Sequence, residues 1–511
     1  MKSRPLRLFA LAAVCAAPAL AQTTPAPSHV ERFSTLETRA ERVEAEANAK
    51  LASDPNDAQT LHLRGLARMS LGRFAEAGED FRRAVALRPA VSEYHSNLGF
   101  TLWKLGRSEE AVAALRAALK LDDKNANAHF QLGRFLARLG GRERLSEAVG
   151  HLRRVLELDA RQYEVRFELI AAHRALGDAA EAATQLDLLM DARPSDPRVF
   201  YTSGLLAADR DDLPAAVKDF NEALRRDPAL VSAWRDLGLA YTKLARWPEA
   251  VEAFAELSRR QADSVEAAYL HALALYNAGR GPEAERESRR ALRLNAGAAE
   301  AHTLLGVILA SRGDSNAEAA EALSQAATLN PKSFDARFYL GRVLYALKDH
   351  DGAVREFRAA VGLQPRHAEA RFFLGTALES AGDSQSAMAE YEELVRLDAQ
   401  SAVGQLGLGA LLLKQGKTDE AVEALRRAAS LAPKNFEAHW ALGRALAAAR
   451  RHAEAVDVLT AAVALAPYRA DAHYQLGLAL RRVGRAEEAA REFAVVDKLN
   501  TQFRTGAPAK P

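Results

Sequence analysis

The sequence of 511 residues contains a single cysteine, Cys15, which lies within the first twenty-one residues. If that segment is removed, the rest of the chain has no thiol for chemistry and needs no disulfide in an oxidising compartment. No apolar run after residue 21 is long enough to cross a membrane. The formal net charge is only +2, so the chain lacks the excess of basic residues that neutralises phosphates, which argues against nucleic-acid binding.

Motifs that mark catalysis are missing as well. The sequence has no glycine-rich phosphate loop, no paired-histidine metal motif on one helix and no nucleophile-elbow pattern. No stretch leaves room for an independent catalytic domain. We therefore expect no enzyme activity, no cofactor and no metal site.

A long-period repeat is the dominant feature that is present. Thirteen alanines, here called the alanine ladder, recur every 34 residues, apart from one step of 37 and one of 35. They are Ala77, Ala111, Ala148, Ala182, Ala216, Ala250, Ala284, Ala319, Ala353, Ala387, Ala421, Ala455 and Ala489. A glycine ladder runs twelve residues upstream wherever no insertion intervenes, and only Ile170 and Ala272 break it. Such a period indicates an array of small units that share a continuous core.

Each unit reads as two short antiparallel helices. In residues 334–365 the apolar residues recur three or four positions apart in two runs, with a break at Lys348–Asp351 between them. Pro365 ends the second run, and prolines end the second run of several other units. The ladder residues are small because the two helices cross there, and a larger side chain would overpack the crossing.

These residues resemble the tetratricopeptide repeat family. Trp234, Leu237, Gly238, Tyr241, Ala250, Phe254 and Leu257 carry most of its pattern in one unit. The resemblance implies an all-α fold, a right-handed α-solenoid of antiparallel helix pairs, with thirteen repeats over residues 58–501. It implies little about activity, because such repeats serve many unrelated partners.

Both ends of the chain differ from the repeats. Residues 1–21 have a basic start, a short apolar stretch and a small-residue cleavage site, which predict a secretory signal peptide and a periplasmic or secreted protein. The alternative is a lipid anchor on Cys15, although Val14 is branched where such signals favour a small residue. We expect a linker over 22–29, a capping helix over 30–55 and a disordered tail over 502–511.

The resemblance also indicates where a partner binds. In such arrays the first helix of each unit lines the concave face, and one lining position lies three residues before the glycine ladder. Eight units have an aromatic residue there: Phe130, Phe167, Tyr201, Tyr269, Phe338, Phe372, Trp440 and Tyr474. Acidic residues lie three positions earlier, and some units add an arginine one position after the ladder. These residue types suit an extended or helical protein segment. The alternative is that the rings wedge neighbouring units together while the acids favour helix N-termini.

We expect the binding surface between Phe338 and Tyr474. The predicted contact residues are Phe338, Arg342, Tyr345, Phe372, Phe373, Trp440, Arg444, Tyr474 and Arg481. The function that fits is a non-catalytic scaffold of the bacterial cell envelope that binds protein or peptide segments. We expect no nucleic-acid partner and no membrane insertion after signal cleavage. The alternative is a periplasmic accessory of a polysaccharide- or protein-export complex.

Two narrower hypotheses concern single repeat positions. His95, His129, His302, His439 and His473 all lie four residues before the glycine ladder. They either bind a metal between adjacent repeats or fill a bulky, part-buried position, and no carboxylate or cysteine completes a ligand set. The clamp that some members of the family use for a C-terminal carboxylate is absent, because only Asn97 matches its pattern.

Overall fold

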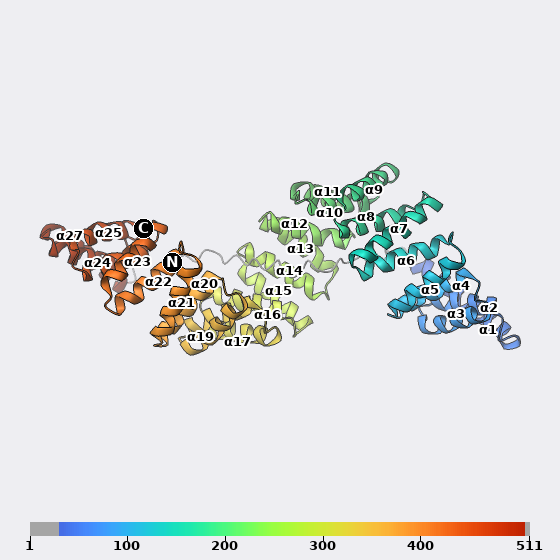
Figure 1. Cartoon of the computed structure of the whole chain (residues 1–511), viewed down its shortest axis with the longest axis horizontal. Coiled ribbons are helices and arrows are strands. Elements are labelled where there is room, and N and C mark those ends of the chain that lie inside the picture. Colours follow the sequence, from blue (N-terminus) through green and yellow to red (C-terminus); the bar gives the residue numbers. More distant parts are fainter. Residues whose placement is uncertain (1–29, 506–511) are drawn as a thin grey trace. The chain divides into compact units, whose positions relative to one another are not determined.

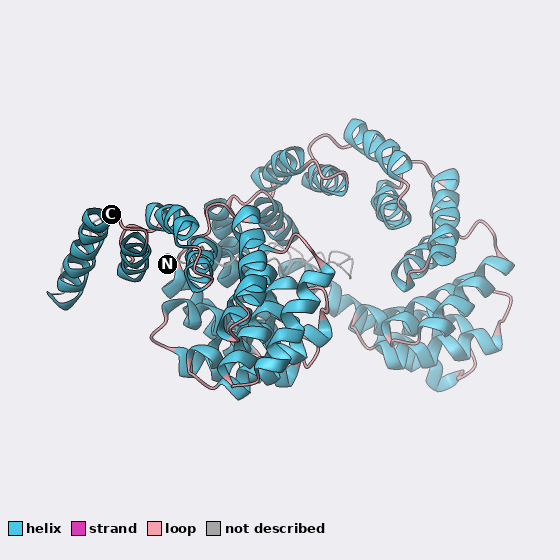
Figure 2. Cartoon of the chain, turned by 60° about the vertical axis from the view of Figure 1, so that its left-hand side comes forward, coloured by secondary structure: helices cyan, strands magenta, loops and turns pink. Residues whose placement is uncertain are grey.

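The computed structural model describes residues 30–505, with side chains described from residue 39 to residue 502. These residues form 27 helices and no strand (Figure 2). None of the helices in this range is both long and apolar enough to span a membrane. The predicted signal peptide (1–21) and linker (22–29) lie outside the described residues. The last helix continues to Thr505, four residues into the predicted disordered tail of 502–511.

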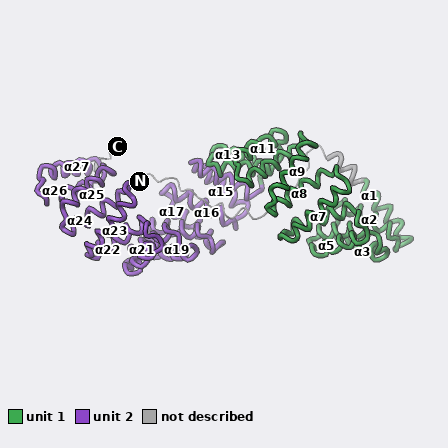
Figure 3. Tube along the Cα trace, turned by 45° about the horizontal axis from the view of Figure 1, so that its top comes forward, with its two compact units in different colours: residues 1–262 green, residues 263–511 purple. Residues whose placement is uncertain are grey.

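The helices fall into two compact units, residues 1–262 and residues 263–511 (Figure 3), and Figure 1 labels the helices along the chain. Unit 1 contains α1 (Val30–Ser53), α2 (Ala58–Ser70), α3 (Phe74–Leu87), α4 (Ser92–Lys104), α5 (Ser108–Leu121), α6 (Ala126–Leu139), α7 (Arg142–Leu158), α8 (Tyr163–Leu176), α9 (Ala179–Ala192), α10 (Pro197–Asp209), α11 (Leu213–Arg226), α12 (Val231–Lys243) and α13 (Trp247–Arg260). Unit 2 contains α14 (Val265–Asn277), α15 (Gly281–Leu294), α16 (Ala299–Arg312), α17 (Asn316–Leu329), α18 (Phe334–Ala346), α19 (His350–Leu363), α20 (Ala368–Ser380), α21 (Ser384–Leu397), α22 (Ala402–Lys414), α23 (Thr418–Leu431), α24 (Phe436–Ala448), α25 (His452–Leu465), α26 (Ala470–Arg482) and α27 (Ala486–Thr505).

After α1, consecutive helices pack as hairpins, α2 with α3 and so on to α26 with α27. Every residue of the alanine ladder is buried, with at most 2% of its surface exposed. A Cβ atom on Gly238 would lie 2.6 Å from Cε1 of Phe254, and one on Gly341 would lie 2.8 Å from Cε1 of Phe357. Real Cβ atoms essentially never come within 3.0 Å of another atom. The glycine ladder therefore makes room for the large side chain of the second helix in the same hairpin.

The two exceptions to the glycine ladder are accommodated differently. Ala272 belongs to the hairpin in which Ser288 occupies the position that holds phenylalanine, tyrosine or leucine elsewhere, so the larger residue is matched by a smaller one. Ile170 has no such compensation and packs against Leu186 and Leu189. Among the hairpins of the described chain, α8 and α9 pack least extensively. This agrees with crowding of that crossing by Ile170.

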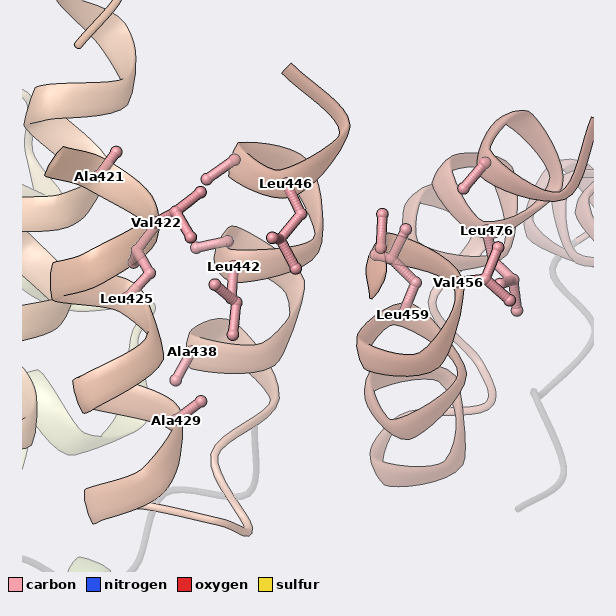
Figure 4. Close-up of a cluster of buried hydrophobic side chains, with 14 of the residues drawn as sticks. Ala421, Val422, Leu425, Ala429, Ala438, Leu442, Leu446, Val456, Leu459 and Leu476 are labelled. Atoms are coloured by element: carbon pink, nitrogen blue, oxygen red, sulfur yellow. The ribbon is translucent and has the colours of Figure 1, made fainter. Parts of the chain in front are cut away.

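The hydrophobic core runs along the array and has no single centre. One cluster in unit 2 spans α22 to α27 and includes Leu425, Leu442, Leu459 and Leu476 (Figure 4). Because side chains from consecutive helices share it, each hairpin completes its core only against its neighbours.

The N-terminal helix α1 covers the first hairpin through apolar and ionic contacts. Leu51 is buried in a cluster with residues of α2, α3 and α4. Asp80 on α3 is only 2% exposed and accepts hydrogen bonds from the guanidinium groups of Arg64 and Arg68 at 2.6–3.0 Å. Arg68 also donates to Glu44 of α1 at 2.9 Å. The two arginines that replace apolar residues in this hairpin thus connect α1 to it.

Candidate binding face

The first helices of successive hairpins form the inner side of each unit. In unit 2, α14, α16, α18, α20, α22, α24 and α26 each contact the next one in this series. The second helices of successive hairpins make no comparable contact among the described residues. The first helices therefore form the more closely spaced row. The surface of this row that faces away from the second helices is called the inner face of unit 2.

The predicted contact residues gather into two clusters on this face. Phe338, Arg342, Tyr345, Phe372 and Phe373 lie on α18 and α20, whereas Trp440, Arg444, Tyr474 and Arg481 lie on α24 and α26. Helix α22 separates the clusters, and its sequence from Ala402 to Lys414 contains no aromatic residue. The first group is here called the α18–α20 cluster and the second the α24–α26 cluster.

Phe338 packs between repeats. Its side chain is only 4% exposed, and its ring centroid lies 6.0 Å from Phe357 on α19 and 5.9 Å from Phe373 on α20. The ring of Phe373 in turn stacks on Phe357 at 5.7 Å. Phe338 therefore acts as a wedge between neighbouring repeats, because its ring lies between them and little of its surface is exposed to a partner.

Other aromatic residues of the two clusters are more accessible. Tyr474 is 47% exposed, with its ring 5.9 Å from Phe493 of α27. Trp440 is half-buried, and its indole Nε1 is covered without a hydrogen-bond partner. Phe372 is also half-buried, 6.0 Å from the ring of Tyr391. The hydroxyl of Tyr345 bonds to Ser380 Oγ at 3.1 Å.

The arginines of the two clusters lie over aromatic rings. The guanidinium carbon of Arg342 is 5.4 Å from the ring centroid of Phe373 and 5.9 Å from that of Tyr339. Arg444 lies 4.8 Å from the ring of Trp440, and Arg481 lies 5.9 Å from that of Phe493. These distances are within the range of cation–π attraction.

Tyrosines that sequence reasoning did not select complete the surroundings of Arg342. Burial, together with the negative charge of Asp335, raises the pKa of Tyr339 to about 12. Burial also raises the pKa of Tyr276, and the positive charge of Arg342 opposes that increase. Tyr276 on α14 has the same repeat position as Tyr345, four residues after the glycine-ladder position, so repeat alignment could have found it.

The recurrent histidines each form a hydrogen bond with the backbone of the preceding turn. In each of the five, Nε2 lies 2.8–3.1 Å from the backbone carbonyl oxygen six residues earlier, in the turn before the helix. Trp234 and Arg371 occupy the same position and donate to the carbonyls of Pro228 and Pro365. Tryptophan and arginine donate hydrogen bonds but do not ligate metals, so the shared property of this position is donation to the turn. In the range that the structure describes, no three histidine, cysteine or carboxylate side chains cluster as metal ligands would.

Family comparisons agree with the repeat structure. A model described as tetratricopeptide repeat matches residues 201–266, 236–288, 269–316, 312–363, 349–402 and 406–470, together more than half of the chain. The chain belongs to the tetratricopeptide repeat family. Related tetratricopeptide repeat models match residues 58–91, 104–140 and 141–208.

Individual proteins similar to this chain include one curated relative and several solved structures. Superkiller complex protein 3 of Mus musculus is 26% identical over 198 residues, which are 37% of this chain and 12% of that protein. Among solved structures, the APC/C hetero-tetramer Cut9–Hcn1 has a TM-score of 0.43 at 15% identity and covers 88% of this chain and 95% of that chain. The tetratricopeptide repeat protein YrrB has a TM-score of 0.34 at 23% identity, covering 37% of this chain and 97% of that chain. MamA has a TM-score of 0.31 at 22% identity, covering 32% and 95%.

Proposed function

We propose that this chain is a non-catalytic scaffold of the bacterial cell envelope, an array of thirteen repeats that binds protein segments on the inner face of unit 2. Membership of the tetratricopeptide repeat family supports an interaction role. The observation that carries the proposal is the combination, in both clusters, of part-exposed aromatic rings with arginines that form no ion pair with any residue the structure describes. Aromatic and arginine side chains are the types that most often dominate binding energy.

The location in the envelope rests on residues 1–21. Mass spectrometry of the exported protein should find a mature chain that begins at or near Gln22. Recovery of the protein with an intact Met1 from the envelope fraction would contradict cleavage of a signal peptide.

Binding on the inner face is tested with Trp440→Ala. Peptides selected from a random phage-displayed library on the full chain serve as the probe. If Trp440 anchors a partner, its replacement should weaken the binding of these peptides by about 2 kcal/mol or more. Because Trp440 is half-buried, the melting temperature is measured on the same protein, and affinity is expressed per folded molecule.

Trp103→Ala is the matched control. Trp103 on α4 stacks on Phe135 of α6 with ring centroids 4.1 Å apart and lies in unit 1. It should lower stability without changing peptide affinity. If Trp440→Ala behaves in the same way as Trp103→Ala, the inner face of unit 2 is not the binding surface.

A further inference from the structure

Arg342 is a part-buried guanidinium group without a countercharge. Its Nη1 atom is covered and has no hydrogen-bond partner, and no carboxylate lies within 4.0 Å of its nitrogens among the described residues. The rings of Phe338, Tyr339 and Phe373 surround it at 5.4–5.9 Å. A guanidinium group withdrawn from water without an acidic partner is costly, and a carboxylate that reached it would form a charge-assisted hydrogen bond.

The corresponding arginine of unit 1 is already paired. Arg134 occupies the same repeat position as Arg342 and lies over Phe130, but its Nε is 2.9 Å from Glu168 of the next first helix. Arg174, which lies at a different repeat position, four residues after the ladder position, also has an acidic partner, Asp209, at 2.5 Å. The lack of a partner at Arg342 is therefore not a general property of this repeat position.

A second arginine of the same kind lies three hairpins further along unit 2. Arg444 is exposed, lies over Trp440 and forms no ion pair with any described residue. Adjacent packed helices are about 10 Å apart, so α18 and α24 are separated by roughly 30 Å. An extended chain covers that span with about nine residues, at about 3.3 Å per residue.

We propose that Arg342 and Arg444 each receive the side-chain carboxylate of an aspartate or glutamate within one bound protein segment. This inference rests on the proposed function and specifies the chemistry of its partner. A chain terminus supplies only one backbone carboxylate, whereas Arg342 and Arg444, which share the repeat position one residue after a ladder glycine, require two acidic groups. The segment therefore carries two acidic residues about nine positions apart when extended, with apolar residues between them that face α20 and α22.

Acidic residues on the inner face restrict the segment further. Asp335 lies two helical turns before Arg342 on α18, and burial raises the pKa of its carboxyl group. Glu369 has the equivalent position on α20 and is exposed. These carboxylates repel a uniformly acidic tail. They tolerate a segment whose acidic residues are separated and placed toward the arginines.

The test uses the full chain and a phage-displayed library of random peptides of about sixteen residues, long enough to reach both arginines. We expect the selected peptides to be enriched in aspartate or glutamate beside apolar residues. Replacing the critical acid of a selected peptide by its amide should weaken binding about tenfold or more, and Arg342→Gln should weaken the unmodified peptide by a similar factor. Combining the two changes should add no further loss, because both remove the same contact.

Arg134→Gln is the matched control, since its guanidinium has the same repeat position but an internal acidic partner. It should leave peptide affinity unchanged. Arg342→Lys retains the charge but loses the planar fork, so it should recover only part of the affinity. If Arg342→Gln lowers the melting temperature, Arg444→Gln provides the same measurement at an exposed position.

The outcomes separate this inference from the proposed function. Selected peptides without an acidic preference, or acidic peptides that bind equally well to Arg342→Gln and Arg444→Gln, would overturn the inference and leave the scaffold role intact. Failure to recover any peptide that depends on Trp440 would overturn both.

Discussion

Replacing Gly341 by alanine tests whether the glycine ladder sets the packing of each hairpin. The new Cβ would lie 2.8 Å from both Cδ1 and Cε1 of Phe357, so the ring would have to withdraw by about 0.6 Å to reach an ordinary contact of 3.4 Å. Phe357 is completely buried, and the rings of Phe338 and Phe373 are within 6.0 Å of it. The ring is therefore enclosed by other side chains and can move only if they move as well.

Two effects of opposite sign decide the result. Alanine in place of a helical glycine stabilises the chain by about 0.5–1 kcal/mol, whereas overpacking a close-packed core costs about 1–3 kcal/mol. We expect the second effect to prevail and Gly341→Ala to lose about 1–2 kcal/mol. Ala272 is consistent with this expectation, since its hairpin has Ser288 in place of the large side chain.

Gly362 provides the control within the same repeat. It lies on α19, and a Cβ there would meet nothing within 4 Å. Gly362→Ala should therefore stabilise the chain by about 0.5–1 kcal/mol. Because repeat arrays need not unfold in one step, urea unfolding is combined with hydrogen exchange of peptides from α18 and α19. If Gly341→Ala stabilises as Gly362→Ala does, the explanation of the ladder by close packing is wrong.

Three further predictions concern local stability and pH. Asp80→Ala leaves the guanidinium groups of Arg64 and Arg68 without their shared acid, so it should reduce the hydrogen-exchange protection of α1–α3 by about 3–5 kcal/mol. The control, Glu76→Gln, changes a half-exposed carboxylate and should alter this protection by less than about 1 kcal/mol. Equal effects of the two variants would refute the role of the buried network. The backbone amides of residues 163–228 should exchange hydrogen faster than those of residues 334–398, because α8–α9 packs least extensively among the hairpins of unit 1 and α9–α10 least extensively among the junctions between its hairpins. The reverse order of exchange rates would count against this. Burial lowers the pKa values of His62 and His151 below 6.5, so the unfolded chain binds protons before the folded chain as the pH falls. The stability that these neutral histidines contribute should be fully present above about pH 6.5 and decline below it. The double variant His62→Gln/His151→Gln should therefore show a smaller fall of the melting temperature with decreasing pH, and an unchanged fall would assign the decline to other groups.

The sequence was sufficient to predict the repeats because their signals are local. Ladder residues, helix-ending prolines and apolar spacing all lie within one unit, and each hairpin forms its own crossing. The fold class and the positions of most helices follow from these signals. The end of α27 did not, since the composition after residue 501 predicted a tail and the helix continues to Thr505.

Whether a predicted contact residue is buried or accessible, and paired or unpaired, could not be predicted from the sequence of its own repeat unit. Phe338 is buried because Phe373 of the next repeat covers it, and Arg134 differs from Arg342 because Glu168 lies opposite it. Both facts depend on which residue the neighbouring repeat supplies. The sequence placed these side chains on the correct helices but did not distinguish a wedge from an accessible ring or a paired arginine from an unpaired one.

Tyr391 has a consequence for how this array could grow or shrink. Most residues opposite a ladder glycine need that space only within their own hairpin, so in-frame duplication or loss of a whole 34-residue unit preserves the fit. The ring of Tyr391, however, would meet a Cβ at 2.6 Å both on Gly375 of its own hairpin and on Gly407 of the following one. Loss or replacement of only one of the two units around it would therefore break this fit. An artificial shuffling of repeats should be cut on either side of this pair and not between its members.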